Sequence, residues 1–212
     1  GVSVGLGRRL SWPDDFFTLY NEISFQNYTL DNYKGYFSLL QNNGVSNNFS
    51  VNTTFGRNSV DQPIYPRKGS NFALTLAITP PYSLISGKDF TGAPQSEKYK
   101  WIEYYKWSFK AEWYMNLVDK LVLFTRGQFG FKGYYNKSIG QSPFEGFYVG
   151  GDGMVGYNFY GYEVIPVRGY SNSGAGNTIG ALTPPGGANY YTKYTMELRY
   201  PISLNQQATV LL

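Results

Sequence analysis

Apolar and polar side chains alternate with a period of two residues, and this alternation recurs in segment after segment. From Tyr105 to Met115 the odd positions are apolar or aromatic, whereas the even positions include Lys106, Lys110 and Glu112. Successive side chains of a β-strand point to opposite faces, so the pattern predicts a strand with one apolar and one charged face. It recurs over residues 2–9, 17–26, 49–55, 72–79, 121–132, 195–200 and 208–212. We therefore expect eight strands and no convincing helix.

Strand length and connection length decide between a soluble β-sandwich and a transmembrane barrel, because both alternate. The predicted strands over 16–28, 104–115 and 121–134 have about 12 residues or more, against about 5–6 in globular proteins. Tyrosines crowd the strand ends, as in the aromatic girdles of outer-membrane barrels. Short connections near 10–16, 116–120 and 201–206 alternate with long ones over 30–48, 80–103 and 135–192. Short periplasmic turns opposite long external loops are typical of bacterial outer-membrane barrels.

The fold class that we predict is therefore an all-β, transmembrane antiparallel β-barrel. Its aromatic face would contact lipid, and its charged face would line an aqueous interior. No apolar run approaches the ~18 residues of a membrane helix, but a spanning strand needs only about 9–11 residues. A soluble β-sandwich, such as a carbohydrate-binding module, is the alternative. The side chains expected to face lipid include Phe72, Leu74, Leu76, Trp107, Phe109, Trp113, Phe129 and Phe131.

The composition excludes most kinds of catalytic and metal site. The 212 residues include no cysteine and no histidine, which removes the ligands of a structural zinc site and the usual base of a serine or cysteine nucleophile. Residues 150–153 lack the glycine-lysine pattern of a phosphate-binding loop. The basic residues are spread along the chain at a net charge of +4, unlike a nucleic-acid footprint. We expect no enzyme, no metal or other cofactor and no nucleic-acid partner.

The connection over 135–192 is too long for a plain linker, since structureless loops beyond about 12–15 residues are usually functional or disordered. Its many rings and branched aliphatic side chains, such as Phe144, Tyr157 and Ile165, favour burial. The barrel interior is the nearest place, but the side chains of an eight-stranded barrel fill their own interior. We therefore expect the chain to form part of a larger barrel, with this loop folded inward.

The sequence in this loop resembles a known family. The VRG[F/Y] motif in the sixth external loop of BamA-type outer-membrane assembly factors is matched by Val167, Arg168, Gly169 and Tyr170. The FY-x-GG element that introduces the same loop is resembled by Phe147, Tyr148, Gly150 and Gly151. Residues 63–70 resemble the family's turn before an alternating strand. The similarity runs along essentially the whole chain, and the extra residues 152–166 resemble the Bacteroidetes branch.

The resemblance implies that residues 1–212 are part of one barrel domain, as strands six to thirteen of sixteen, with the sixth external loop near 135–192. No periplasmic POTRA domains would precede Gly1. The implied function is non-enzymatic insertion of β-barrel proteins into the outer membrane of a Gram-negative bacterium. The implied partners are membrane lipid and lipopolysaccharide, unfolded outer-membrane protein precursors, accessory lipoproteins or surface proteins, and the rest of its own barrel. A two-partner secretion transporter of the same superfamily and a passive porin are the membrane alternatives.

Arg168 needs a carboxylate partner if its loop lies inside a barrel, because a guanidinium pairs bidentately with a carboxylate. Glu197 has the parity to face the interior, since Met196 and Leu198 take the other face. We expect these two residues to pin the loop to the wall. Loss of one partner would cost about 3–5 kcal/mol in a dry pair and about 1 kcal/mol or less in a wet one. The other inward charges, which include Lys106 and Lys132, either solvate a wet wall, the favoured interpretation, or line a conduit.

Overall fold

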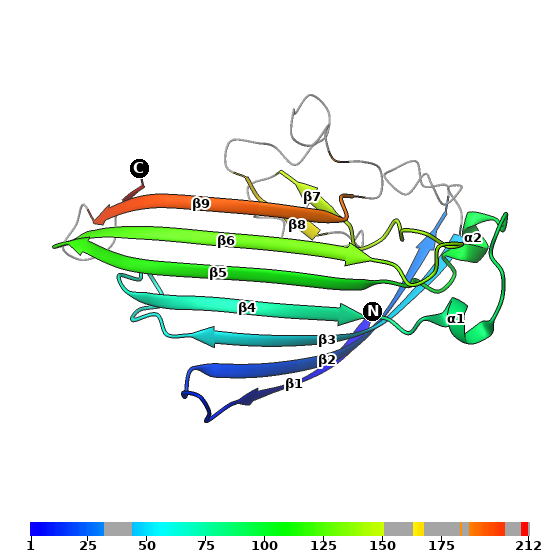
Figure 1. Ribbon diagram of the computed structural model, residues 1–212, viewed down its shortest axis with the longest axis horizontal. Helices are drawn as coiled ribbons and strands as arrows, with labels where there is room; N and C mark the ends of the chain where they lie inside the picture. The colour runs from blue at the N-terminus through cyan, green and yellow to red at the C-terminus, as the bar shows by residue number, and fades with distance from the viewer. Residues whose placement is uncertain (32–43, 151–162, 168–182, 184–186, 202–208, 212) are drawn as a thin grey trace.

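A single antiparallel sheet dominates the computed structural model, which describes residues 1–31, 44–150, 163–167, 183, 187–201 and 209–211 (Figure 1). The strand order is β1-β2-β3-β4-β5-β6-β9-β10, so each strand pairs with its neighbours in the sheet as an up-and-down meander. This eight-stranded sheet confirms the predicted all-β fold class, as a barrel fragment that is not closed on itself. The strands are β1 (Val2–Arg9), β2 (Phe17–Leu30), β3 (Gly44–Asn58), β4 (Gly69–Ile78), β5 (Tyr105–Val118), β6 (Leu121–Gly133), β9 (Tyr190–Pro201) and β10 (Thr209–Leu211).

The register of the sheet keeps the two faces separate. Between β5 and β6, Trp107 lies opposite Phe131 on one face, whereas Lys106 lies opposite Lys132 on the other. A slip of one residue would move every side chain to the wrong face, so the apolar pattern and the pairing specify each other. A two-residue turn of Asp119 and Lys120 joins these strands. Asp119 has φ 48°, as the primed hairpin turns require at their first position.

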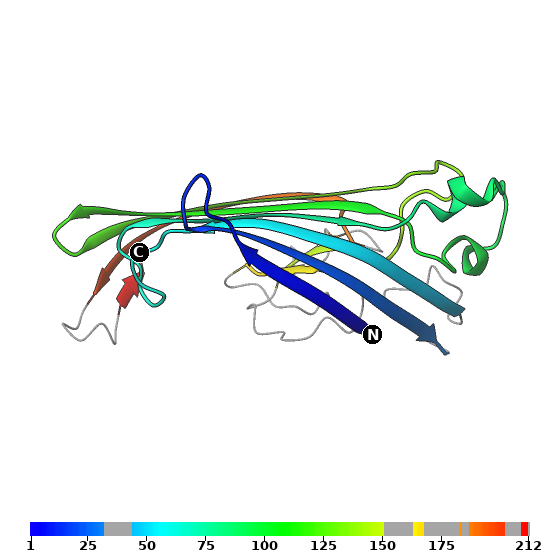
Figure 2. The same cartoon turned by 90° about the horizontal axis from the view of Figure 1, so that it is seen from below.

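The sheet is curved, and its two faces differ in exposure. Figure 2 shows it arching over β7 (Phe147–Val149) and β8 (Glu163–Ile165), a separate parallel pair on its concave side. The concave face buries polar groups, among them Ser24, Ser50 and Glu112. Trp107 and Trp113, on the convex face, are 39% and 52% exposed. The aromatic face is therefore the outer one, as the alternation predicts.

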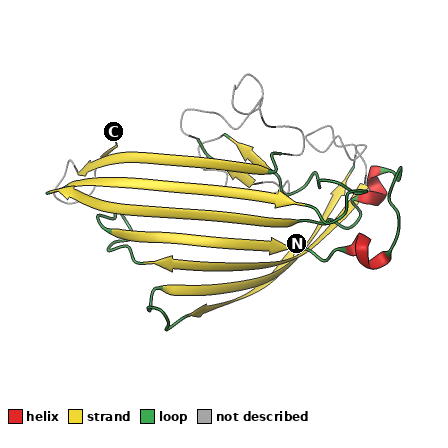
Figure 3. Ribbon diagram, viewed as in Figure 1, coloured by secondary structure: helices red, strands yellow, loops and turns green. Residues whose placement is uncertain are grey.

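The connections divide between the two ends of the sheet. Short turns join β1 to β2 and β5 to β6 at one end, and the long connections lie at the other. The β4–β5 connection contains two short helices, α1 (Tyr82–Ser86) and α2 (Gln95–Lys98), drawn red in Figure 3. The expectation of no helix was wrong here, because elements of five and four residues are too short to give a helical period. No described helix is long and apolar enough to cross a membrane.

Strand β3 begins at Gly44, earlier than its alternation suggests, because residues 44–48 pair with the end of β2. The β4–β5 connection also contacts this polar stretch. The Asn47 backbone N–H donates to the Lys100 carbonyl (2.9 Å), and the Ile102 N–H donates to the Asn47 carbonyl (2.9 Å). Ile102 also joins Ala77, Tyr104 and Phe144 in a buried cluster. Phe144 belongs to the β6–β9 connection. The two long connections therefore share one small core with the sheet, which forms the wall of the barrel fragment.

Candidate functional site

The base of the long connection lies against the concave face of the sheet. We use "loop base" for residues 142–149 and 163–167. Phe147 of β7 is fully buried and forms a cluster with Ile165 of β8 and Tyr191 of β9. The ring centroids of Phe147 and Tyr191 are 4.7 Å apart. The apolar composition of the connection predicts this burial, but a β-pair inside it was not predicted, because three-residue strands carry too little alternation to detect.

A glycine on the wall makes room for these rings. Gly130 of β6 is buried on the concave face, and a Cβ there would lie 2.2 Å from Tyr191 Cε1 and 2.7 Å from Phe147 Cζ. Both rings are packed against each other, so neither can move aside alone. The absent side chain therefore allows Phe147 to rest directly on the backbone of the sheet. At the end of β7, Gly150 has φ 139°, a conformation that favours glycine.

Two wall lysines contact the loop base. Lys106 is buried, with Nζ 2.9 Å from Glu163 Oε2 and 3.5 Å from Glu145 Oε2. The same ammonium lies 4.7 Å from the centroid of the Phe147 ring. Lys132 is completely buried, and its Nζ donates to the carbonyls of Ser142 (2.7 Å) and Phe144 (2.9 Å). The interpretation of a wet wall was wrong for the completely buried Lys132, because the alternation identifies the face of a residue but not what covers it.

The VRG[F/Y] motif is described only at its first residue. Val167 is half-buried at the end of the loop base, and the preceding Pro166 carbonyl accepts a hydrogen bond from Lys193 of β9. Arg168, Gly169, Tyr170 and Gly151 lie outside the described residues, so the expected contact between Arg168 and Glu197 stays a prediction. In the FY-x-GG element, Tyr148 is half-buried beside Phe147.

Glu197 lies on the concave face of β9, as its parity predicts. Its side chain is 13% exposed, and Oε2 accepts hydrogen bonds from Arg199 Nε (3.0 Å) and Nη2 (2.7 Å). The Arg199 guanidinium also stacks 3.9 Å from the centroid of the buried Phe124 ring. Arg199 was not among the predicted site residues, although its position two residues after Glu197 on the same face was a usable signal.

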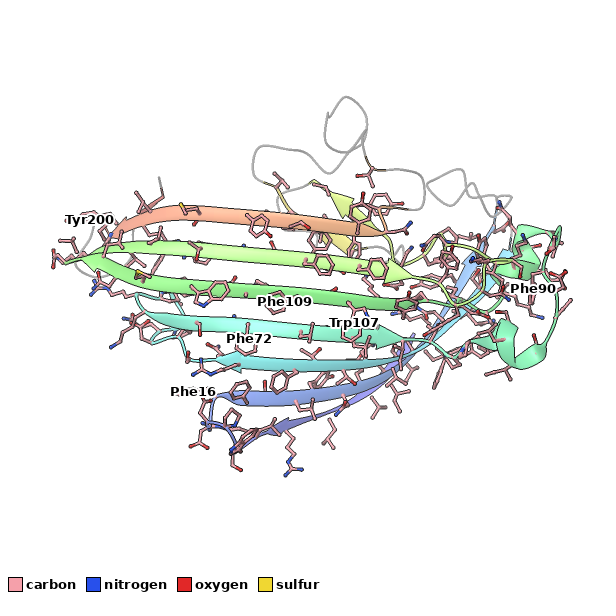
Figure 4. The ribbon with its side chains drawn as sticks, in the orientation of Figure 1. Phe16, Phe72, Phe90, Trp107, Phe109 and Tyr200 are labelled. Atoms are coloured by element: carbon pink, nitrogen blue, oxygen red, sulfur yellow. The ribbon has the colours of Figure 1, made fainter. Side chains whose placement is uncertain are left out.

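The side chains predicted to face lipid lie on the convex face. Figure 4 shows Phe72, Trp107 and Phe109 along the middle strands, with Phe16 and Tyr200 near the short-turn end. Phe72 and Leu76 are partly buried by their neighbours. An exposed apolar surface on this scale marks a membrane or protein contact rather than a solvated face. The members that are more than one third exposed are Leu74, Trp107, Phe109, Trp113, Phe129 and Phe131.

The concave face carries the ionic and polar groups. A hollow of about 270 Å³ lies between the wall of β2–β5 and the loop base, lined by Ser24, Asn48, Ser50, Lys106, Glu145 and Glu163 among others. This arrangement can hold water and ion pairs. Within the described ranges, no group of three or more carboxylate, histidine or cysteine side chains could hold a metal ion. The geometry is that of a barrel wall with a loop docked on its concave face.

Comparison with known proteins decides the family. The model of the Omp85 superfamily domain matches residues 1–211. The chain belongs to the Omp85 superfamily. No curated protein matches this Omp85 chain, but its structure is similar to the crystal structure of BamA from Haemophilus ducreyi lacking POTRA domains 1-3. The TM-score is 0.62 at 17% sequence identity, over 97% of this chain and 38% of that chain.

The superfamily match and the fold confirm the resemblance carried by the VRG[F/Y] motif. The Omp85 chain is part of a bacterial outer-membrane β-barrel protein, and it spans 38% of the length of the BamA chain whose fold it resembles. The alternative of a soluble β-sandwich is thereby excluded.

Proposed function

We propose that this Omp85 chain is part of a BamA-like insertase, which folds β-barrel precursors into the outer membrane. The observation that carries the proposal is the burial of the loop base on the concave face, directly before the VRG[F/Y] motif. Phe147 of the FY-x-GG element is fully buried there, against Tyr191 of β9 and the backbone of β6 at Gly130. A wide solvated pore has no need of such a docked element. The proposed action makes and breaks no covalent bond and uses no cofactor.

In this proposal the chain supplies strands six to thirteen of a sixteen-stranded barrel, and the loop near 135–192 is the sixth external loop. A precursor strand would pair with an exposed strand edge elsewhere in the complete barrel, which is β-augmentation. The convex aromatic face would contact lipid and lipopolysaccharide. Unfolded precursors and accessory lipoproteins or surface proteins would be the protein partners. The chain described here would act as a rigid back wall that holds the loop.

Depletion of the full-length protein tests the proposed function. We expect the amounts of many outer-membrane β-barrel proteins to fall together, because each of them would depend on the insertase. The measurement is quantitative proteomics of outer-membrane fractions, with the plasmid-borne wild-type gene as the control for recovery. Loss of one secreted polypeptide, with the other barrel proteins unchanged, would instead identify a two-partner secretion transporter.

The predicted pairing of Arg168 with Glu197 is part of the same proposal. Either single charge reversal, Arg168→Glu or Glu197→Arg, is expected to impair assembly of outer-membrane proteins, because it places like charges together. The double reversal restores the attraction, although the guanidinium introduced on β9 would then face Arg199, the wall arginine that holds Glu197. We therefore expect fuller recovery when Arg199→Gln is added to the double reversal. Equal impairment in the single, double and triple variants would contradict the pairing.

A further inference from the structure

Lys106 and Lys132 are direct cross-strand partners on the concave face. Like charges directly opposite each other on neighbouring strands destabilise a sheet, and both of these lysines are buried. The neighbouring strand β4 offers no counter-charge to Lys106, since the residue opposite it there is Ala77. A buried charge needs a counter-charge or hydrogen-bond acceptors. The compensation for this lysine pair must therefore come from another part of the chain.

The loop base supplies it. Lys106 meets two carboxylates, Glu145 just before β7 and Glu163 at the start of β8. Glu145 lies in the first segment of the loop base (142–149), and Glu163 lies in the second (163–167). One ammonium therefore binds both segments, or limbs, of the loop base to the sheet. Lys132 binds the carbonyls of Ser142 and Phe144, further back on the first limb. The acceptors thus lie on the loop base, and the donors lie on the wall.

We propose that the lysine pair positions the loop base, as an electrostatic latch that holds both limbs against the barrel wall. Lys106 and Lys132 are positioning residues, because they act through the loop and not on a precursor. The functional consequence rests on the proposed insertase role, whereas the latch itself does not. When the loop base is docked, two carboxylates surround Lys106, and two backbone carbonyls accept hydrogen bonds from Lys132. When it is undocked, two like charges remain side by side on the wall.

The charges in the latch predict an unequal response to mutation. Lys106→Met leaves Glu145 and Glu163 facing each other beside the buried Phe147 ring, with no cation between them. Glu145→Gln or Glu163→Gln leaves one carboxylate paired with Lys106. The triple variant Lys106→Met/Glu145→Gln/Glu163→Gln has no unpaired charge at this position. Loop docking should therefore be weakest in Lys106→Met, nearly normal in each glutamine variant, and largely restored in the triple variant.

Docking can be measured with a reporter thiol, because the described chain has no cysteine of its own. Ile165 is 3% exposed in the cluster with Phe147, so Ile165→Cys in the full-length protein should react slowly with a water-soluble maleimide. Local opening exposes such a thiol. We expect Lys106→Met to raise the labelling rate about tenfold or more, since two neighbouring carboxylates with no cation between them repel each other and favour opening. Lys106→Arg keeps the charge and should label nearly as slowly as the parent.

Lys110 provides the matched control. It lies four residues along the same face of β5 but pairs with Glu112 of the wall, which Arg126 also holds. Lys110→Met should therefore leave the labelling of the Ile165→Cys reporter unchanged. Labelling in Lys106→Met that is no faster than in Lys110→Met would overturn the proposal. So would a triple variant that labels as fast as Lys106→Met.

Two further measurements keep the test decisive. If Lys106→Met does not reach the folded, heat-modifiable form, the triple variant must fold in higher yield than Lys106→Met, and an equal yield overturns the latch. Where Lys106→Met does fold, outer-membrane protein levels should fall in cells that carry it and recover with Lys106→Arg. Fast labelling without any loss of assembly would leave the latch intact and count against the proposed insertase role.

Discussion

Phe147→Ala is expected to release the loop base from the wall. The ring is fully buried, contacts Tyr191 and lies over the Lys106 ammonium. Truncation of a buried phenylalanine costs about 3–5 kcal/mol, because the transfer free energy of the ring is lost and a cavity remains. The loss falls on loop docking, since β5 and β6 keep all of their own hydrogen bonds. Protease cleavage within 134–189 of the full-length protein in lipid vesicles should therefore become much faster.

Val149→Ala is the matched control for this change. Val149 is on the same short strand but only half-buried, so its truncation should change the cleavage rate little. The barrel itself should remain heat-modifiable in both variants. An unchanged cleavage rate in Phe147→Ala would show that the ring does not hold the loop base, and would remove the main support for the proposed function.

Phe109→Lys should strongly impair insertion of the chain into lipid. Phe109 lies on the convex face near the middle of β5, opposite Phe129 of β6. A lysine on the lipid face of an outer-membrane barrel costs about 2–4 kcal/mol near the bilayer midplane and much less near the interfaces. The free energy of unfolding, measured by urea titration of the full-length protein in vesicles, should fall by about that amount.

The neighbouring residue separates a lipid effect from a general strand effect. Ser108 points to the concave face and lines the polar hollow, where the new ammonium of Ser108→Lys can stay hydrated. We expect this variant to lose much less stability than Phe109→Lys. If both lysines cost the same, the convex face does not contact hydrocarbon.

The strands and their faces could be predicted from the sequence because a local pattern fixes them. Trp107 and Lys106 fall on opposite sides by parity alone, and the structure places them so. The contacts of the lysines could not be predicted, since Glu145 and Glu163 lie 39 and 57 residues further along the chain than Lys106. Gly130 gave no signal either, because its role depends on two rings brought together only by the fold.

The short elements of the connections show a different limit of prediction from sequence. Short elements such as α1, α2, β7 and β8 carry too few residues for a period, so their positions depend on what they pack against. Tyr104 and Phe144, from two separate connections, meet in one cluster, and nothing in either segment alone indicates that contact. The VRG[F/Y] resemblance identified the family, but it could not reveal that Lys106 and Lys132 hold the segment before it.

The two-residue turn between β5 and β6 constrains how the length of this protein can vary. Val118 pairs with Leu121 across Asp119 and Lys120, so one inserted residue could invert the parity of everything that follows in β6. Lys132 would then point into the bilayer and Phe131 into the water. Insertions in the α1–α2 connection meet no such restriction, since no sheet pairing passes through residues 87–94. Length changes, and engineered epitope tags, belong there rather than at the tight hairpin.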